Sequence, residues 1–246
     1  MEDNYGLLDW INIEKLNWVN LSRNPEAITL LEMFPEKIDW FHLSKNTSAI
    51  HLLEANQDKL DWVWLSSNPN AVHMLEANPD KIDWICLSKN PSAIHLLEAN
   101  VGKINWSYLS TNPSAIHILE ANPDKIMPHW LSLNPSAMHI LKANQEHIDW
   151  FFLSSNPSPE AIELLEANSE KICWSGLSSN PSAIGLIEAN KNKIDWDEIT
   201  LNPLAIHLLS EAVEANKNQI NWSLLSENPA IFKSYSPNYD TEYVLK

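Results

Sequence analysis

The fold is decided by a phrase that reads Asn90-Pro91-Ser92-Ala93-Ile94-His95-Leu96-Leu97-Glu98-Ala99-Asn100 and continues as Val101-Gly102-Lys103-Ile104-Asn105-Trp106-Ser107-Tyr108-Leu109-Ser110-Thr111. Variants of this phrase follow one another along most of the chain. They open at Asn24, Asn46, Asn68, Asn90, Asn112, Asn134, Asn156, Asn180, Asn202 and Asn228, spaced by 22 residues except for 24 after Asn156 and 26 after Asn202. Such a period indicates stacked units that cannot bury their apolar faces alone.

Each repeat is predicted to hold two short helices. In the repeat that opens at Asn90, this Asn and Pro91 fit the N-cap and first position of a helix, because Asn accepts bonds from orphan amides and Pro lacks one. Apolar residues at helical spacing follow. Asn100 is predicted to cap a second helix that carries Trp106. Helices of two to three turns are too short to persist alone, so neighbouring repeats must stabilise them.

The predicted fold class is therefore all-α, an α-solenoid of short helix pairs with about nine repeats of 22 residues. We expect residues 1–23 to form a degenerate N-terminal cap, 24–227 the solenoid, and 228–246 a partial repeat and tail. With helices about 8–10 Å apart, nine repeats would span roughly 70–100 Å. One repeat deviates, because Pro128 occupies the tryptophan position and Trp130 stands two residues later. The residues from Ser210 to Val213 add about one helical turn.

Composition narrows the possible partners and compartments. The formal charge is −16 at pH 7, which disfavours nucleic acid held through its phosphates and favours basic or apolar protein surfaces. Cys86 and Cys173 are four repeats apart without metal-type spacing, so we expect reduced thiols. The start of the chain resembles no signal peptide, and no apolar run reaches the roughly 18 residues of a membrane span. The sequence therefore predicts a soluble protein that is not secreted.

The repeat phrase also resembles a known group of sequences. Asn-Pro-Ser-Ala-Ile-His-Leu-Leu-Glu-Ala-Asn, followed by Lys-Ile-Asp-Trp and Leu-Ser, is similar to tandem repeats in proteins of giant double-stranded DNA viruses. The ending Leu225-Ser226-Glu227-Asn228-Pro229-Ala230-Ile231-Phe232 is similar to the way those proteins close. The resemblance covers about residues 18–232 and implies a helical repeat fold and a viral origin. It implies no active site. A looser likeness to leucine-rich variant repeats supports the same architecture.

Several residue types recur at one position of the repeat and form ladders. Histidines stand at 51, 73, 95, 117, 139 and 207, and we expect a solvated or hydrogen-bonded face on which His95 could pair with Glu98; a pH-sensitive surface is the alternative. Zinc is disfavoured because successive rungs start about 8–10 Å apart. Aspartates before the tryptophans have no contrasting environments for acid and base roles, and the serines before each Asn fit turns. The recurrent tryptophans are predicted to be core.

Two residues after each tryptophan position vary while the rest of the repeat is constant. Equivalent positions in a solenoid line one strip of surface, where aromatic residues could anchor a partner. The alternative is half-buried packing between helices. The candidate partner-binding residues are Phe41, His42, Trp64, Tyr108, Trp130, Phe151 and Phe152.

The function that these patterns favour is a noncatalytic scaffold that mediates protein–protein interaction, with a host or viral protein as partner. The alternative is a structural component of a virion or virus-built assembly, in which copies of the chain associate with one another. No catalytic constellation, cofactor site or metal site is predicted, and no nucleic-acid or membrane partner is expected. The resemblance would place the protein in the host cytoplasm or the virion.

Overall fold

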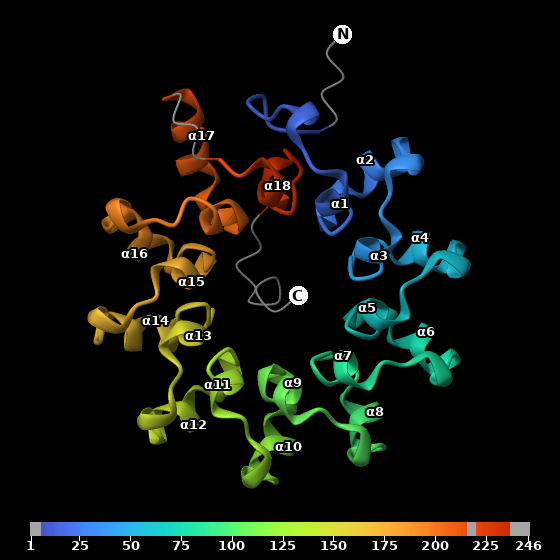
Figure 1. The fold of residues 1–246 in the computed structure, drawn as a ribbon, viewed down its shortest axis with the longest axis vertical. Coiled ribbons are helices and arrows are strands. Elements are labelled where there is room, and N and C mark those ends of the chain that lie inside the picture. Colours follow the sequence, from blue (N-terminus) through green and yellow to red (C-terminus); the bar gives the residue numbers. More distant parts are fainter. Residues whose placement is uncertain (1–5, 216–219, 237–246) are drawn as a thin grey trace. The chain divides into compact units, whose positions relative to one another are not determined.

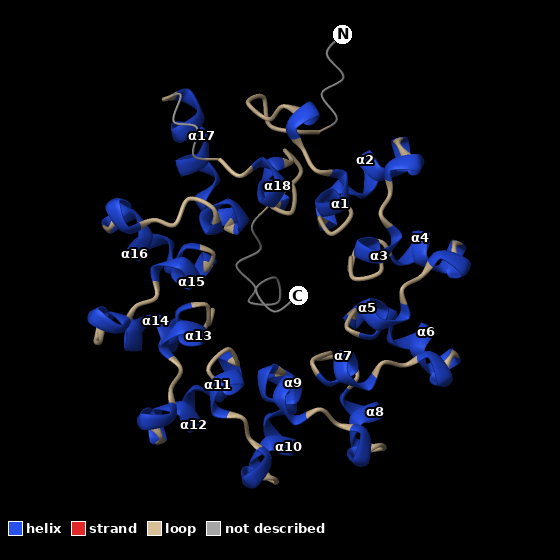
Figure 2. Ribbon diagram, in the orientation of Figure 1, coloured by secondary structure: helices blue, strands red, loops and turns tan. Residues whose placement is uncertain are grey.

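The computed structural model describes residues 6–215 and 220–236, and over these residues the chain is an all-α solenoid (Figures 1 and 2). The extended pairing in this part of the chain is one isolated antiparallel bridge between Leu7 and Phe232. No helix among the described residues is both long enough and apolar enough to span a membrane. The prediction of fold class is confirmed.

The first helix of each repeat follows the repeat's opening Asn. In most repeats a single 3-10 turn begins at the Pro and leads into a short α-helix. These α-helices are α2 (Ile28–Met33), α4 (Ile50–Ala55), α6 (Val72–Ala77), α8 (Ile94–Glu98), α10 (Ile116–Glu120), α12 (Met138–Ala143), α14 (Pro159–Glu166), α16 (Ile184–Ala189) and α17 (Ile206–Glu214). The nine residues of α17 confirm the predicted extra turn. The turns before them are Pro25–Ala27, Pro69–Ala71, Pro113–Ala115, Pro135–Ala137, Pro181–Ala183 and Pro203–Ala205, with Pro229–Ile231 in the last repeat.

The second helix of each repeat begins later than predicted. The side chain of Asn100 does not cap a helix. Its Nδ2 donates back to the Leu96 carbonyl at 2.9 Å, and a 3-10 turn at Val101–Lys103 follows. The chain is then extended at Ile104, and Asn105 caps the helix that begins at Trp106. The equivalent turns are Ile13–Lys15, Pro35–Lys37, Gln57–Lys59, Pro79–Lys81, Pro123–Lys125, Gln145–His147, Ser169–Lys171 and Lys191–Lys193.

The tryptophan position marks the start of these second helices. They are α1 (Trp18–Leu21), α3 (Trp40–Leu43), α5 (Trp62–Ser66), α7 (Trp84–Ser88), α9 (Trp106–Thr111), α11 (Pro128–Leu131), α13 (Trp150–Ser154), α15 (Trp174–Ser178) and α18 (Trp222–Leu225). After Trp196 a 3-10 helix, Glu198–Leu201, takes the equivalent place. Pro128 is accepted at the first position of α11 because that position needs no amide donor.

The chain divides into two compact units. Unit 1 joins Met1–Leu60 with Ser178–Val244, and unit 2 contains Asp61–Leu177. Within unit 2, α5, α7, α9, α11 and α13 form one row on the concave side of a curve, and α6, α8, α10, α12 and α14 form a second row outside it (Figure 1).

The core is made of small aliphatic side chains that recur in every repeat. One column of leucines comes from the second helices, with Leu65, Leu87 and Leu109 fully buried. A second column, which includes Leu75 and Leu97, comes from the first helices, and the alanine that precedes most of these helices, such as Ala71 and Ala93, is also fully buried. Each repeat therefore contributes the same few apolar side chains, whose burial offsets the entropy cost of ordering helices too short to be stable alone.

Candidate interaction surface

Buried asparagines connect successive repeats. Asn90 is fully buried; its Oδ1 accepts a hydrogen bond from the Ser92 amide, and its Nδ2 donates to the carbonyls of Ser66 and Asn68 in the preceding repeat, each at 3.0 Å. One side chain therefore caps its own repeat and satisfies two backbone acceptors of the neighbour. The same pattern recurs at Asn46, Asn112, Asn134, Asn202 and Asn228.

The serines that stand two residues before most of these asparagines form a parallel set of bonds; before Asn202 this position is Thr200. Ser88 is fully buried, its hydroxyl donates to the Trp84 carbonyl at 2.7 Å, and it accepts from the Asn105 amide of the next repeat at 2.9 Å. The sequence identified these serines as turn residues only. They also join one repeat to the next.

The residues before the tryptophans are helix N-caps. Asp83 Oδ1 accepts from the Cys86 amide at 2.7 Å, and Asn105 Oδ1 accepts from the Tyr108 amide at 3.1 Å. The same bond forms from the side chains of Asn17, Asp39, Asp61, Asp149, Asp195 and Asn221. Asp and Asn both occur here because either side chain supplies an acceptor oxygen, whereas Met127 in the equivalent position makes no side-chain cap. The capping bonds agree with the structural interpretation of the aspartate ladder.

The recurrent tryptophans are half-buried, so the prediction that they are core is wrong in part. The ammonium group of Lys103 lies 4.3 Å from the ring centroid of Trp84, which belongs to the preceding repeat. Further Lys–Trp pairs of this kind are Lys37–Trp18, Lys59–Trp40, Lys81–Trp62 and Lys171–Trp150. These cation–π contacts add an inter-repeat attraction worth about 0.5–2 kcal/mol each. The signal in the sequence was the recurrent Lys three residues before the next tryptophan position.

The histidine ladder pairs between repeats and not within a helix. His95 Nε2 lies 2.8 Å from Glu76 Oε1 of the preceding repeat, while Glu98 pairs with His117 of the next at 2.9 Å. The predicted pair of His95 with Glu98 is therefore wrong. Equivalent pairs are His51–Glu32, His139–Glu120 and His207–Glu188, all about half exposed. Among the described residues no three His, Cys, Asp or Glu side chains converge as a metal site would require.

Most of the candidate partner-binding residues come together in unit 2. The rings of Tyr108 and Trp130 lie 5.9 Å apart between centroids, and those of Trp130 and Phe152 stack at 5.4 Å. Lys89 lies between the rings of Trp64 and Tyr108, with its ammonium 5.5 Å from the centroid of each. These rings are half-buried, so they pack between helices and still present an edge to solvent.

The position directly after the tryptophan is more exposed in several repeats, although Ser107 and Ser175 in that position are half-buried. Val63, Ile85 and Phe151 of unit 2 are 47%, 49% and 57% exposed. Together with Trp64, Tyr108, Trp130 and Phe152 they form what we call the apolar strip, which follows the row of α5, α7, α9, α11 and α13. The strip ends at Gly176 in α15, where an added Cβ would lie 2.6 Å from Ser155 Oγ, so a larger side chain would require neighbouring atoms to move. Sequence reasoning singled out the aromatic residues and missed the exposed aliphatic ones.

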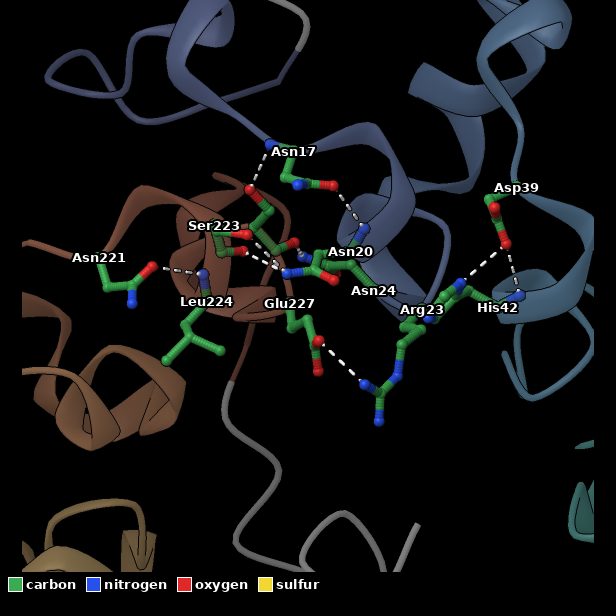
Figure 3. A network of polar contacts seen from close by, with 11 residues as sticks. Asn17, Asn20, Arg23, Asn24, Asp39, His42, Asn221, Ser223, Leu224 and Glu227 are labelled. Atoms are coloured by element: carbon green, nitrogen blue, oxygen red, sulfur yellow. Dashed lines mark hydrogen bonds and ion pairs between the residues drawn. The ribbon is translucent and has the colours of Figure 1, made fainter.

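Phe41 and His42 lie in unit 1, and their rings contact at 5.1 Å between centroids. Phe41 is 46% exposed. His42 is held by Asp39, with Nδ1 2.8 Å from Oδ1 (Figure 3). Burial of the Asp39 carboxyl acts to raise its pKa, but hydrogen bonds from the amide and ring of His42 outweigh burial and keep that pKa below its ordinary value. His42 is thus engaged with its own helix cap.

The first and last repeats are in contact within unit 1 (Figure 3). Asn24 Nδ2 donates to the carbonyls of Ser226 at 2.9 Å and Asn228 at 3.0 Å. Arg23 forms an ion pair with Glu227 at 3.0 Å. The sequence predicted separate caps for the two ends, and the structure pairs the described parts of both segments with each other.

Comparisons with known proteins give no relative. No protein-family model, no curated protein and no solved structure matches this chain. The interpretation of the surface therefore depends on its own geometry.

Proposed function

We propose that the protein is a noncatalytic repeat scaffold that binds a partner protein through the apolar strip of unit 2. The observation that carries this proposal is the exposure of Val63, Ile85 and Phe151 on the same helix row as the contacting rings of Tyr108, Trp130 and Phe152. Apolar side chains gathered on one row of helices are typical of protein-binding surfaces, and aromatic residues dominate the energetics of such interfaces.

The charge of the chain indicates the charge expected on the partner's surface around its apolar anchors. The strip carries aliphatic and aromatic groups, with Lys89 between Trp64 and Tyr108 and the exposed His129–Asp149 pair on the same helix row, whereas the whole chain has a formal charge of −16. A partner with apolar anchors on a basic background would be steered by the overall charge and held by the strip. The similarity of the repeat phrase to proteins of giant DNA viruses supports a viral origin, with a host or viral protein as the partner in the host cytoplasm or the virion.

A noncatalytic role is supported by what the reactive side chains do. The recurrent aspartates cap helices, and the recurrent serines bond to backbone groups of two repeats. Both sets are engaged in structural hydrogen bonds at every repeat where they are described. They hold the helix row that carries the strip in a fixed register.

The pairing of the terminal segments bears on the alternative function, a structural component whose copies join end to end. The described end segments already contact each other through Asn24, Ser226 and Asn228. End-to-end joining would have to displace these contacts, so we favour the scaffold.

The test is a comparison of two surface variants. The strip variant carries Val63→Ser, Ile85→Ser and Phe151→Ser; the matched control carries Val101→Ser, an apolar residue 52% exposed on a turn of the same unit. Each tagged protein is used to capture partners from cells that naturally express the chain. We expect the strip variant to capture at least tenfold less of the partner protein than the wild type, and the control to capture as much as the wild type. Both variants should have equal helical circular dichroism. Equal capture by the strip variant would overturn the proposal.

A further inference from the structure

The contact between the terminal segments repeats the bonds of an internal repeat interface. Inside the array, Asn46 Nδ2 donates to the carbonyls of Ser22 and Asn24, and the Asp39 amide donates to Ser22 Oγ at 3.0 Å. Lys37 lies over the ring of Trp18 at 4.6 Å. These four contacts define the standard interface.

At the terminal contact every one of these bonds has its counterpart. Asn24 Nδ2 donates to the carbonyls of Ser226 and Asn228, and the Asn17 amide donates to Ser226 Oγ at 2.8 Å. Lys15 lies over the ring of Trp222 at 4.8 Å. The N-terminal segment therefore packs on the last repeat as any repeat packs on the one before it.

Other contacts are found where the terminal segments meet and have no counterpart in the internal interface just described. The Leu8 amide donates to the Ile231 carbonyl at 2.8 Å, and the Lys233 amide donates to the Gly6 carbonyl at 2.7 Å, on either side of the Leu7–Phe232 bridge. Gly6 has a φ of 76°, a left-handed conformation that favours glycine. The ion pair of Lys233 with Asp9 at 2.7 Å and that of Arg23 with Glu227 add charge complementarity.

We propose that this terminal contact is an exchangeable latch whose second occupant is another copy of the same chain. When the terminal contact forms within one chain, the protein is monomeric. When it opens, the N-terminal segment of one copy binds the last repeat of another through the same hydrogen bonds. The surfaces are identical in every copy, so exchange of an identical segment creates two intermolecular contacts for two intramolecular ones and leaves no bond unmade. Linkage within one chain favours the monomer through its high effective concentration.

The two ion pairs allow the exchange to be tested by charge reversal. Variant N carries Arg23→Glu and Asp9→Lys, and variant C carries Glu227→Arg and Lys233→Asp. Each variant alone places like charges opposite each other at both pairs, which disfavours its own latch. In a mixture, all four pairs are complementary between the two chains. A chain with all four substitutions restores the intramolecular pairs and is the matched control.

Light scattering and circular dichroism of the separate and mixed proteins give the result. We expect the wild-type chain and the fourfold control to keep the mass of the 28.1 kDa chain, and an equimolar mixture of N and C to shift to twice that mass or more. A variant that loses helicity alone and recovers it with the doubled mass on mixing would also support exchange.

Two results would overturn the proposal. One is a mixture of N and C that remains at the mass of a single chain, because complementary latches would then not recruit a second copy. The other is a doubled mass for N or C alone that mixing does not increase, because association would then occur at another surface. A mixture that remains unfolded also counts against exchange, since the complementary contacts would have failed to form.

Discussion

Replacement of Asn90 by alanine is expected to destabilise the chain by about 2–4 kcal/mol. The side chain is fully buried, and three hydrogen bonds depend on it. Loss of the N-cap at Ser92 costs about 1 kcal/mol. Loss of the donor to the Ser66 carbonyl costs about 1–3 kcal/mol more, because that acceptor is buried. The Asn68 carbonyl is less affected, since it still accepts from the Ala71 amide at 3.2 Å.

The matched control is Asn100→Ala in the same repeat. Asn100 is half-buried, and its side-chain Nδ2 donates a local hydrogen bond to the Leu96 carbonyl. We therefore expect Asn100→Ala to lower the free energy of unfolding by about 1 kcal/mol. Equilibrium urea unfolding, followed by circular dichroism, gives both free energies if the dependence on denaturant is unchanged. If the two variants lose the same stability within about 0.5 kcal/mol, the inter-repeat role of the buried asparagines is refuted.

The remaining predictions concern the tryptophan and serine ladders and the carboxyl group of Glu198. Trp84→Ala should lower the free energy of unfolding by about 2–4 kcal/mol, and Lys103→Met should lower it by about 0.5–2 kcal/mol, both measured by urea unfolding. Equal stability of Lys103→Met and the wild type would contradict a stabilising cation–π contact. Ser88→Ala should cost about 1–3 kcal/mol, because the Asn105 amide loses its acceptor, and a neutral result would contradict the serine bonds. Burial, followed by the charges of Asp195 and Asp197, raises the pKa of Glu198, so its neutral form stabilises the fold at low pH and this contribution is lost as pH rises through the raised pKa. Glu198→Gln should therefore raise the melting temperature at neutral pH and lose this advantage below the ordinary glutamate pKa of about 4.3; a gain that is equal at both pH values would contradict it.

The sequence was sufficient for the architecture because the repeat itself is the architectural unit. The Asn-Pro phrase located the first helices, and the extra residues before Asn228 correctly predicted the longer α17. It was less informative about the second helices, because Asn and Asp cap helices equally well. Asn100 and Asn105 are both plausible caps by sequence, and only the extended backbone at Ile104 distinguishes them.

Inter-repeat contacts were harder to predict than contacts within a helix. His95 has Glu98 one helical turn away, yet it pairs with Glu76, which is closer once the repeats stack. The Lys103–Trp84 contact likewise depends on the offset between repeats, which no single repeat specifies. The terminal contact was missed for the same reason, since no single repeat specifies that Lys15 lies over the ring of Trp222.

Amide hydrogen exchange at the terminal segments tests most directly the claim that the last repeat joins the first through the standard interface. The Asn17 amide donates to Ser226 Oγ as the Asp83 amide donates to Ser66 Oγ, at 2.8 and 2.9 Å. We predict that the Asn17 amide, which makes the same bond type, and the Leu8 amide, which donates to the Ile231 carbonyl at 2.8 Å, both exchange as slowly as that of Asp83, within about tenfold. Exchange of Asn17 and Leu8 at the rate of an open chain, with Asp83 still protected, would contradict the account.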